Sequence, residues 1–352
     1  MDIVELLRLS QEKGASDLHM VADSPPMLRI HGNLIPVEGA SIIRKQELHD
    51  MLYAILLDEQ KRRFEENFEM DFSVYLEDVG RFRANIFYEL RGESVAFRTI
   101  PEEIRSLAEL GLPPIASNLI KKDKGLILVT GPTGTGKSTT LAAMIDQINS
   151  ERSAHIITIE DPIEFVHKHK NCIVSQREIG AHTKSFANAL RSALREDPDV
   201  LLVGEMRDIE TTALVLTAAE TGHLVLSSLH TLGAAETTNR IIDMYPPERK
   251  DQIRTQFAEA LLAVISQVLI PTQDGTGRVV ATEVMVGTPA IKHMVRTGTT
   301  HLIPNSLQTG KKHGMHLLTQ SLESLVKQEK ITEAQANSFK LGINEAFGNE
   351  TS

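Results

Sequence analysis

The hydrophobic pattern of the first hundred residues predicts helices that alternate with short strands. A helical spacing of apolar residues predicts an amphipathic helix from Ile3 towards Gly14, and a second helix of mixed charge over 45–67. Alternation of apolar and polar residues predicts strands at 17–20, 27–30, 80–87 and 94–98. Helices interleaved with hairpin-like strand pairs are typical of a compact α+β domain. We place this domain at residues 1–100.

Proline and glycine interrupt the pattern after that domain. Pro101, Gly111, Pro113 and Pro114 surround a short helical stretch over 103–110. Because this composition is typical of a linker, we predict a linker or hinge at residues 101–115, with a domain boundary inside it.

Beyond the linker, apolar runs of strand length alternate with helical stretches. The runs lie at 126–130, 155–159, 171–174, 200–203 and 224–228. Such alternation indicates an α/β domain with a largely parallel sheet, which we place at residues 116–275. From Val279 the pattern changes to one strand, 279–285, followed by helices. We therefore expect a mainly helical C-terminal subdomain at 276–352.

A glycine-rich loop lies between the first of these strands and the helix that follows it. Its sequence, Gly-Pro-Thr-Gly-Thr-Gly-Lys-Ser, has the form of the phosphate-binding P-loop. Glycines let the main chain approach an anion, the lysine reaches the β- and γ-phosphates, and the serine hydroxyl binds Mg²⁺. The alternative is a glycine-rich surface turn. We predict that a nucleoside triphosphate is bound by Gly131, Pro132, Thr133, Gly134, Thr135, Gly136, Lys137, Ser138 and Thr139.

Three carboxylates follow the next strand, at Glu160, Asp161 and Glu164. Clustered carboxylates repel one another unless a cation lies between them, and Mg²⁺ with its waters is the natural partner. We predict that Mg²⁺ is held by Ser138, Glu164 and Glu160. A plain acidic turn is the alternative.

An apolar strand at 200–203 ends in a carboxylate, Glu205. This is the form of a Walker B element, whose final carboxylate holds Mg²⁺ or polarises the attacking water. Gly204 stands where an aspartate is usual, so one carboxylate remains for a task commonly shared by two. We predict that Glu205 is the base that activates water and that Glu164 assists at the metal.

Two histidines bracket the strand at 224–228. His223 precedes it and His230 follows it. A histidine at the end of a strand can be structural, but His230 lies on the side where the nucleotide is expected and could sense the γ-phosphate. The histidines are not spaced beside a carboxylate in a way that indicates a metal site.

Three arginines alternate with apolar residues in the predicted N-terminal strands. Arg81, Arg83 and Arg98 should therefore lie on one face of a sheet. That face is either simply solvated or meets the phosphates of a nucleotide held by a neighbouring subunit. Asp17 and His19 carry a similar ambiguity between a structural and a chemical role.

The composition narrows the possible functions. The chain has 352 residues and a net charge of −10, which disfavours a general polyanion binder, and its aromatic content of 4% offers few stacking platforms for a single strand. Cys172 is the one cysteine, so a disulfide framework and a cysteine-based zinc site are excluded. No apolar run approaches the roughly 20 residues of a membrane span. We expect a cytoplasmic protein without membrane insertion and without direct nucleic-acid binding.

These motifs, in this order and spacing, resemble the Walker A, Asp box, Walker B and His box of the secretion ATPases. Within that superfamily the chain is most similar to the PilT-type retraction ATPases of type IV pili. Further matching residues lie at 14–19, 81–83, 97–98 and 306–310. The resemblance implies a homohexameric ring in which a PAS-like N-terminal domain is joined to a RecA-like P-loop core, with ATP between them.

The resemblance also implies roles for individual residues and for partners. Glu205 would be the general base, His223 and His230 would form the His box, and N-domain arginines would reach a nucleotide at a domain or subunit boundary. Hydrolysis of ATP with Mg²⁺ would drive pilus retraction through an inner-membrane platform protein. The motor would thus lie at the inner face of the cytoplasmic membrane through that partner.

One family feature matches in part. Retraction ATPases carry a helix close to Ala-Ile-Arg-Asn-Leu-Ile-Arg-Glu, and the sequence at 290–297 keeps its apolar spacing but has Lys292, His293 and Thr297 in place of arginine, asparagine and glutamate. Lysine cannot reproduce a bidentate guanidinium contact, so this departure bears on retraction rather than on ATP turnover.

Three other functions are alternatives to a retraction ATPase. They are an extension or type II secretion ATPase, a nucleic-acid-translocating ring, and a scaffold that binds ATP without hydrolysis.

Overall fold

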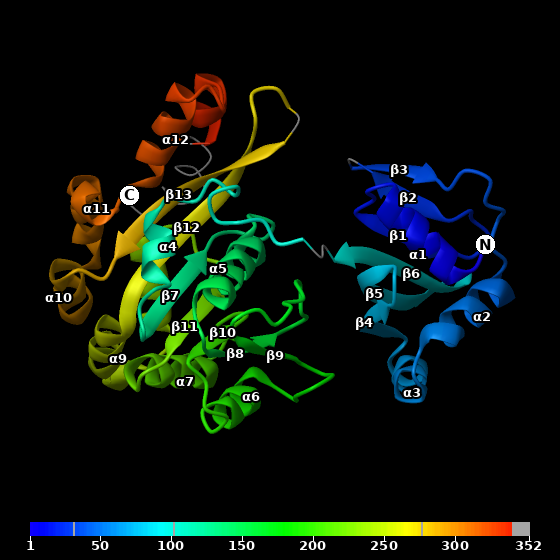
Figure 1. Ribbon diagram of the computed structural model, residues 1–352, viewed down its shortest axis with the longest axis horizontal. Coiled ribbons are helices and arrows are strands. Elements are labelled where there is room, and N and C mark those ends of the chain that lie inside the picture. Colours follow the sequence, from blue (N-terminus) through cyan, green and yellow to red (C-terminus); the bar gives the residue numbers. More distant parts are fainter. Residues whose placement is uncertain (31, 101–102, 276, 340–352) are drawn as a thin grey trace. The chain divides into compact units, whose positions relative to one another are not determined.

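The computed structural model describes residues 1–30, 32–100, 103–275 and 277–339, and these form two compact units (Figure 1). The first unit is Met1–Glu103 and the second begins at Ile104. The boundary between the units falls inside the stretch for which we predicted a linker.

The first unit is a six-stranded antiparallel sheet with three helices. The strand order is β3-β2-β1-β6-β5-β4. The strands are β1 (Asp17–Val21), β2 (Met27–Ile30), β3 (Asn33–Pro36), β4 (Glu69–Leu76), β5 (Gly80–Glu89) and β6 (Gly92–Ile100). The helices are α1 (Ile3–Glu12), α2 (Lys45–Ile55) and α3 (Asp58–Asn67). A capping box between Asp2 and Glu5 starts α1, whose buried Leu6 and Leu7 join Phe82 in the core of this unit.

The second unit has a seven-stranded sheet in the order β13-β12-β7-β11-β10-β8-β9. All neighbours are parallel except β12 and β13. The strands are β7 (Gly125–Thr130), β8 (His155–Glu160), β9 (Ile173–Glu178), β10 (Val200–Val203), β11 (Leu224–Leu229), β12 (Leu261–Pro271) and β13 (Arg278–Val286). The helices are α4 (Ile115–Leu119), α5 (Lys137–Glu151), α6 (Phe186–Ala193), α7 (Ile209–Glu220), α8 (Ala234–Asp243) and α9 (Pro247–Ala260).

Helices cover both faces of this sheet, because successive side chains of a buried strand point to opposite sides. On one face Ile127 and Val129 of β7 pack with α4 and α5. On the other face Leu126 and Leu128 belong to a core formed with α6, α7, α8 and α9. This layering leaves the carboxyl ends of the parallel strands as the edge at which loops gather.

Several short helices follow β13. They are α10 (Pro289–Thr297), η1 (Thr300–Leu302), α11 (Ile303–Thr309), η2 (Lys311–His313) and α12 (Leu318–Lys327). α10 and α11 pack into the same core as α7 and α9, whereas α12 packs on β12 and β13 through Leu322. No helix in the described part of the chain is both long enough and apolar enough to cross a membrane.

Most predicted strands are present, but several details differ. The expected helix over 45–67 is two helices, because Leu56 has an extended backbone that ends α2. The stretch 103–110 is not helical. The sequence pattern missed β3, β4 and β12, and β13 is the edge strand of the core sheet rather than part of a separate helical subdomain.

Candidate nucleotide-binding site

The P-loop connects β7 to α5 at the carboxyl edge of the sheet. Gly131, Gly134 and Gly136 have φ values of 144°, 80° and 83°, a region that side-chain-bearing residues rarely adopt. Gly136 is also the N-cap residue, directly before α5. The loop therefore has the backbone freedom that an anion cradle requires, and it lies at the positive end of a helix dipole.

Lys137, the first residue of α5, is buried and its side chain reaches back to the loop. Its Nζ donates hydrogen bonds to the carbonyl oxygens of Gly131 at 2.9 Å and Pro132 at 3.0 Å. Burial lowers the pKa of the Lys137 ammonium, while the charges of Glu164 and Glu205 act in the opposite direction. A cation that is largely removed from water gains most from an anionic ligand, so this lysine fits a phosphate.

Glu205 and His230 lie beside that lysine. His230 Nε2 is 3.4 Å from Glu205 Oε2, and His230 Nδ1 is 3.4 Å from Lys137 Nζ and 3.5 Å from Thr133 Oγ1. Arg207 Nε pairs with the other oxygen of Glu205 at 2.5 Å. One histidine thus bridges the lysine of the P-loop and the carboxylate that follows β10.

The structure does not bring His223 to this site. It lies at the start of β11, where its Nδ1 is 2.9 Å from the carbonyl oxygen of Ala218. His230 lies past the end of the same strand. Since the P-loop follows the end of β7, a parallel neighbour of β11, only His230 is on the same edge of the sheet within one chain.

The three carboxylates at the end of β8 and just after it differ in their surroundings. Glu160 Oε1 accepts hydrogen bonds from Thr158 Oγ1 at 2.6 Å and Gln176 Nε2 at 3.3 Å. Burial raises the pKa of Glu160 to about 7, against the effect of these hydrogen bonds. Asp161 and Glu164 are exposed, and the charge of Glu164 reaches Lys137.

These surroundings decide how Mg²⁺ would fit. Among the described residues, no three His, Cys, Asp or Glu side chains are grouped to hold a metal. Mg²⁺ at a P-loop normally needs only one or two protein ligands, with phosphate oxygens and water in the other positions. Ser138, at the second residue of α5, and the exposed Glu164 fit that demand. Glu160 fits it less well because its Oε1 already accepts two hydrogen bonds from the protein.

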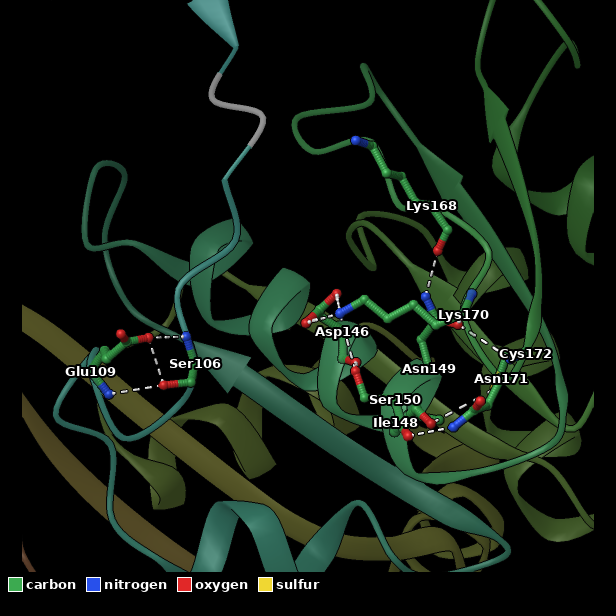
Figure 2. A network of polar contacts seen from close by, with 10 residues as sticks. All are labelled: Ser106, Glu109, Asp146, Ile148, Asn149, Ser150, Lys168, Lys170, Asn171 and Cys172. Atoms are coloured by element: carbon green, nitrogen blue, oxygen red, sulfur yellow. Dashed lines mark hydrogen bonds and ion pairs between the residues drawn. The ribbon is translucent and has the colours of Figure 1, made fainter.

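Residues 168–172, which we call the strap, follow the loop that carries Glu164 and lead into β9. The strap is held by hydrogen bonds to the last turn of α5 (Figure 2). The buried Asn149 of α5 donates to Lys168 O at 2.7 Å and accepts from Lys170 N at 3.1 Å and Cys172 N at 3.3 Å. Lys170 Nζ reaches the carboxylate of Asp146, one turn earlier, at 2.7 Å. Asn149 therefore satisfies three polar groups of the strap at once.

His167, just before the strap, should make the protein sensitive to acid. It is 7% exposed, and burial lowers its pKa from 6.5 to about 4. As the pH falls through 6.5 towards 4, the unfolded chain takes up a proton that the folded chain refuses, so stability declines by up to about 3 kcal/mol. We expect the free energy of unfolding, measured in urea, to fall less from pH 7 to pH 4 for His167→Leu than for the wild type. The exposed His301 provides the control, and His301→Leu should keep the wild-type pH dependence. If the free energy of unfolding changed equally with pH in all three proteins, His167 would not be the source of the acid sensitivity.

The three arginines of the first unit share one face of its sheet, as the alternation predicted. Arg83 lies directly opposite Arg98 in the register of β5 and β6. Arg83 is 3.6 Å from Asp71, and Arg98 Nε donates to Asp17 Oδ1 at 2.9 Å. Asp17 thus has a structural partner, and the exposed side chain of Arg98 projects from the same face. A phosphate contact by Arg81, Arg83 or Arg98 stays a prediction.

Sequence reasoning missed two residues of β12 that contact the site's loops. Gln267 hydrogen bonds to the P-loop at Thr135, and Ser266 Oγ accepts from Gly233 N at 2.8 Å, three residues after His230. No motif marks them, because their contacts depend on β12 lying beside β7.

Known proteins resemble this chain over nearly its whole length. The family described as Type II/IV secretion system protein matches residues 4–346. The type IV pilus retraction ATPase PilT of Pseudomonas aeruginosa is 48% identical over 347 residues, which is 99% of this chain and 100% of that protein. A twitching motility protein of Neisseria gonorrhoeae is 49% identical over 326 residues, which is 93% of this chain and 87% of that protein.

A solved structure extends the likeness to the fold. The crystal structure of the pilus retraction motor PilT with bound ADP has a TM-score of 0.89 and 45% identity, and covers 96% of both chains. The predicted fold class, an α/β P-loop core of RecA-like type with a smaller N-terminal unit and C-terminal helices, is confirmed. The prediction that the chain uses ATP is confirmed, because its relatives are ATPases. The chain is an ATPase that belongs to the Type II/IV secretion system protein family.

Proposed function

We propose that this ATPase is a motor that retracts type IV pili. The names of its relatives support this function, and the match extends over nearly the whole chain. The observation that carries hydrolysis, rather than nucleotide binding alone, is the contact of His230 with both Glu205 and Lys137. The proposed base and the proposed phosphate-binding cation thus lie beside one side chain.

Each residue then has a part in the reaction. Lys137 offsets the charge of the β- and γ-phosphates of ATP, and the loop amides donate hydrogen bonds to them. Ser138 with Glu164 would hold the Mg²⁺ that offsets the phosphate charge further. Glu205 accepts a proton from water as the water oxygen bonds to the γ-phosphorus. The bond from that phosphorus to the β,γ-bridging oxygen breaks, and ADP and phosphate are formed. His230, in contact with both groups, responds to the presence of the γ-phosphate.

The wider assembly follows from the family resemblance. We propose a homohexameric ring in which Arg81, Arg83 or Arg98 of the N-terminal unit meets a nucleotide at a domain or subunit boundary. Residues 101–115 would act as the hinge, since a phosphate that contacts both sides closes them and hydrolysis releases them. The ring would act on an inner-membrane platform protein from the cytoplasmic side of the membrane.

A cell lacking this protein should keep its pili but lose surface motility. We expect pili in normal or increased number by electron microscopy, no twitching on agar, and restoration of twitching by the wild-type gene. The Glu205→Gln gene should not restore twitching, because it supplies a chain without the proposed base. A matched Asp208→Asn gene, which alters only the cap of α7, should restore it.

Loss of pili from the same strain would contradict the proposal and indicate an extension ATPase of the same superfamily. The reason to keep this alternative is the departure from the retraction motif in α10, where Lys292 Nζ donates to the carbonyl oxygen of Glu259 at 2.9 Å and Arg296 pairs with the Glu259 carboxylate at 2.6 Å. Lys292 is one of the positions at which the chain departs from the retraction motif.

A further inference from the structure

Gln267 of β12 contacts the P-loop from inside the protein. Its side chain is buried, with 1% of the residue exposed. Gln267 Nε2 donates to the carbonyl oxygen of Thr135 at 2.7 Å, and Gln267 Oε1 accepts from Thr140 Oγ1 at 2.9 Å. One amide group therefore joins the loop to the first turn of α5.

The main chain of Gln267 is equally close to the loop. A Cβ added at Gly131 would lie 2.2 Å from the carbonyl oxygen of Gln267, and one added at Gly136 would lie 3.5 Å from Gln267 Nε2. Gln267 is therefore hydrogen-bonded to the P-loop at Thr135, and it leaves no room for a side chain at Gly131.

The hydrogen bond to Thr135 fixes more than one carbonyl. In a planar trans peptide the C=O and the following N–H point in opposite directions. Holding the Thr135 carbonyl against β12 therefore turns the N–H of Gly136 away from β12, towards the open side of the loop. Backbone N–H groups on that side are the ones that can meet a phosphate.

We propose that Gln267 is a positioning residue that sets the Thr135–Gly136 peptide for binding the β-phosphate. This inference rests on the proposed ATPase site and adds a residue to it that no motif includes. Glutamine suits the task because its amide donates and accepts at the same time. Methionine of similar shape can do neither, and an ionised glutamate can only accept.

Substitution of Gln267 should weaken nucleotide binding and leave chemistry largely intact. In Gln267→Met we expect the Kd for ADP, measured by calorimetry, and the KM for ATP to rise together by about tenfold, the usual worth of one well-placed hydrogen bond. Because the β-phosphate contact is made in both the ground state and the transition state, kcat should change by less than about twofold.

Gln267→Glu provides a second test within one protein. Burial raises the pKa of the introduced carboxyl, so we expect it to be protonated and to donate to Thr135 at low pH, and to be ionised and face that carbonyl oxygen at high pH. The ratio of its Kd for ADP to that of the wild type should be about ten at high pH and should approach one at low pH. The ratio for Gln267→Met should not change with pH.

Thr282→Val is the matched control for a merely structural effect. Thr282 lies directly opposite Gln267 in the register of β12 and β13, is buried, and bonds to His316 Nε2 at 2.9 Å. The Thr282→Val substitution should lower the melting temperature without changing the Kd for ADP.

Three results would overturn the inference. They are an unchanged Kd in folded Gln267→Met, a pH-independent ratio in Gln267→Glu, and a rise in Kd in Thr282→Val as large as that in Gln267→Met. If the Met variant does not fold, the Kd of the Glu variant measured from about pH 5 to about pH 9 decides. Absence of ADP binding and ATP turnover in the wild type would instead contradict the proposed function.

Discussion

Glu205→Gln should reduce ATP turnover by about a thousandfold while the protein still binds ADP. Glutamine has nearly the same shape as glutamate but cannot take a proton from water. The P-loop is untouched, so the cradle for the phosphates remains. Phosphate release under saturating ATP and calorimetric titration with ADP measure the two effects separately.

Two further variants sharpen this result. Glu164→Gln, which changes a carboxylate that reaches Lys137 only through its charge, should reduce turnover less than Glu205→Gln. Arg207→Gln removes the partner that lies 2.5 Å from Glu205 Oε1 and should keep most of the activity. Wild-type turnover in Glu205→Gln would refute the assignment of the base.

Gly131→Ala is expected to have the largest effect on stability. The added Cβ would lie 2.2 Å from the carbonyl oxygen of Gln267 and 2.9 Å from Thr135 Oγ1, and the residue has a φ of 144°. The backbone of β12 cannot move aside without disturbing the sheet, so we expect a loss of more than about 3 kcal/mol and no binding of ADP.

Gly134→Ala separates the clash from the backbone strain. Gly134 also has a positive φ, but a Cβ there would meet nothing within 4 Å. This variant should lose only about 1 kcal/mol. Thermal unfolding of both variants makes the comparison, and equal melting temperatures would show that the close approach at Gly131 does not matter.

Local patterns were sufficient to predict much of the site. The P-loop, the carboxylates after β8 and Glu205 after β10 each follow an apolar strand bounded by turn residues. The rule that parallel strands end at a common edge then brings Glu205 and His230 together, as the structure shows. The same rule explains why His223, at the other end of β11, stays apart.

What the sequence pattern missed depends on contacts between distant segments. β12 follows α9 without a turn and is almost continuously apolar, so no change in periodicity marks where the strand begins. Gln267 and Thr135 are 132 residues apart in the chain. Asn149 of α5 reads as an ordinary polar residue of a helix until the strap folds over it. Such roles appear only once the strand order is known.

The anchoring of α5 at both ends has a mechanical consequence. Thr140 in its first turn is tied to β12, and Asn149 in its last turn is tied to the strap. With 15 residues, α5 is a stiff rod roughly 22 Å long. These two ties oppose fraying at either end of α5. We therefore expect a displacement of the P-loop to move the strap and, through it, β9, the outermost strand on that side of the sheet.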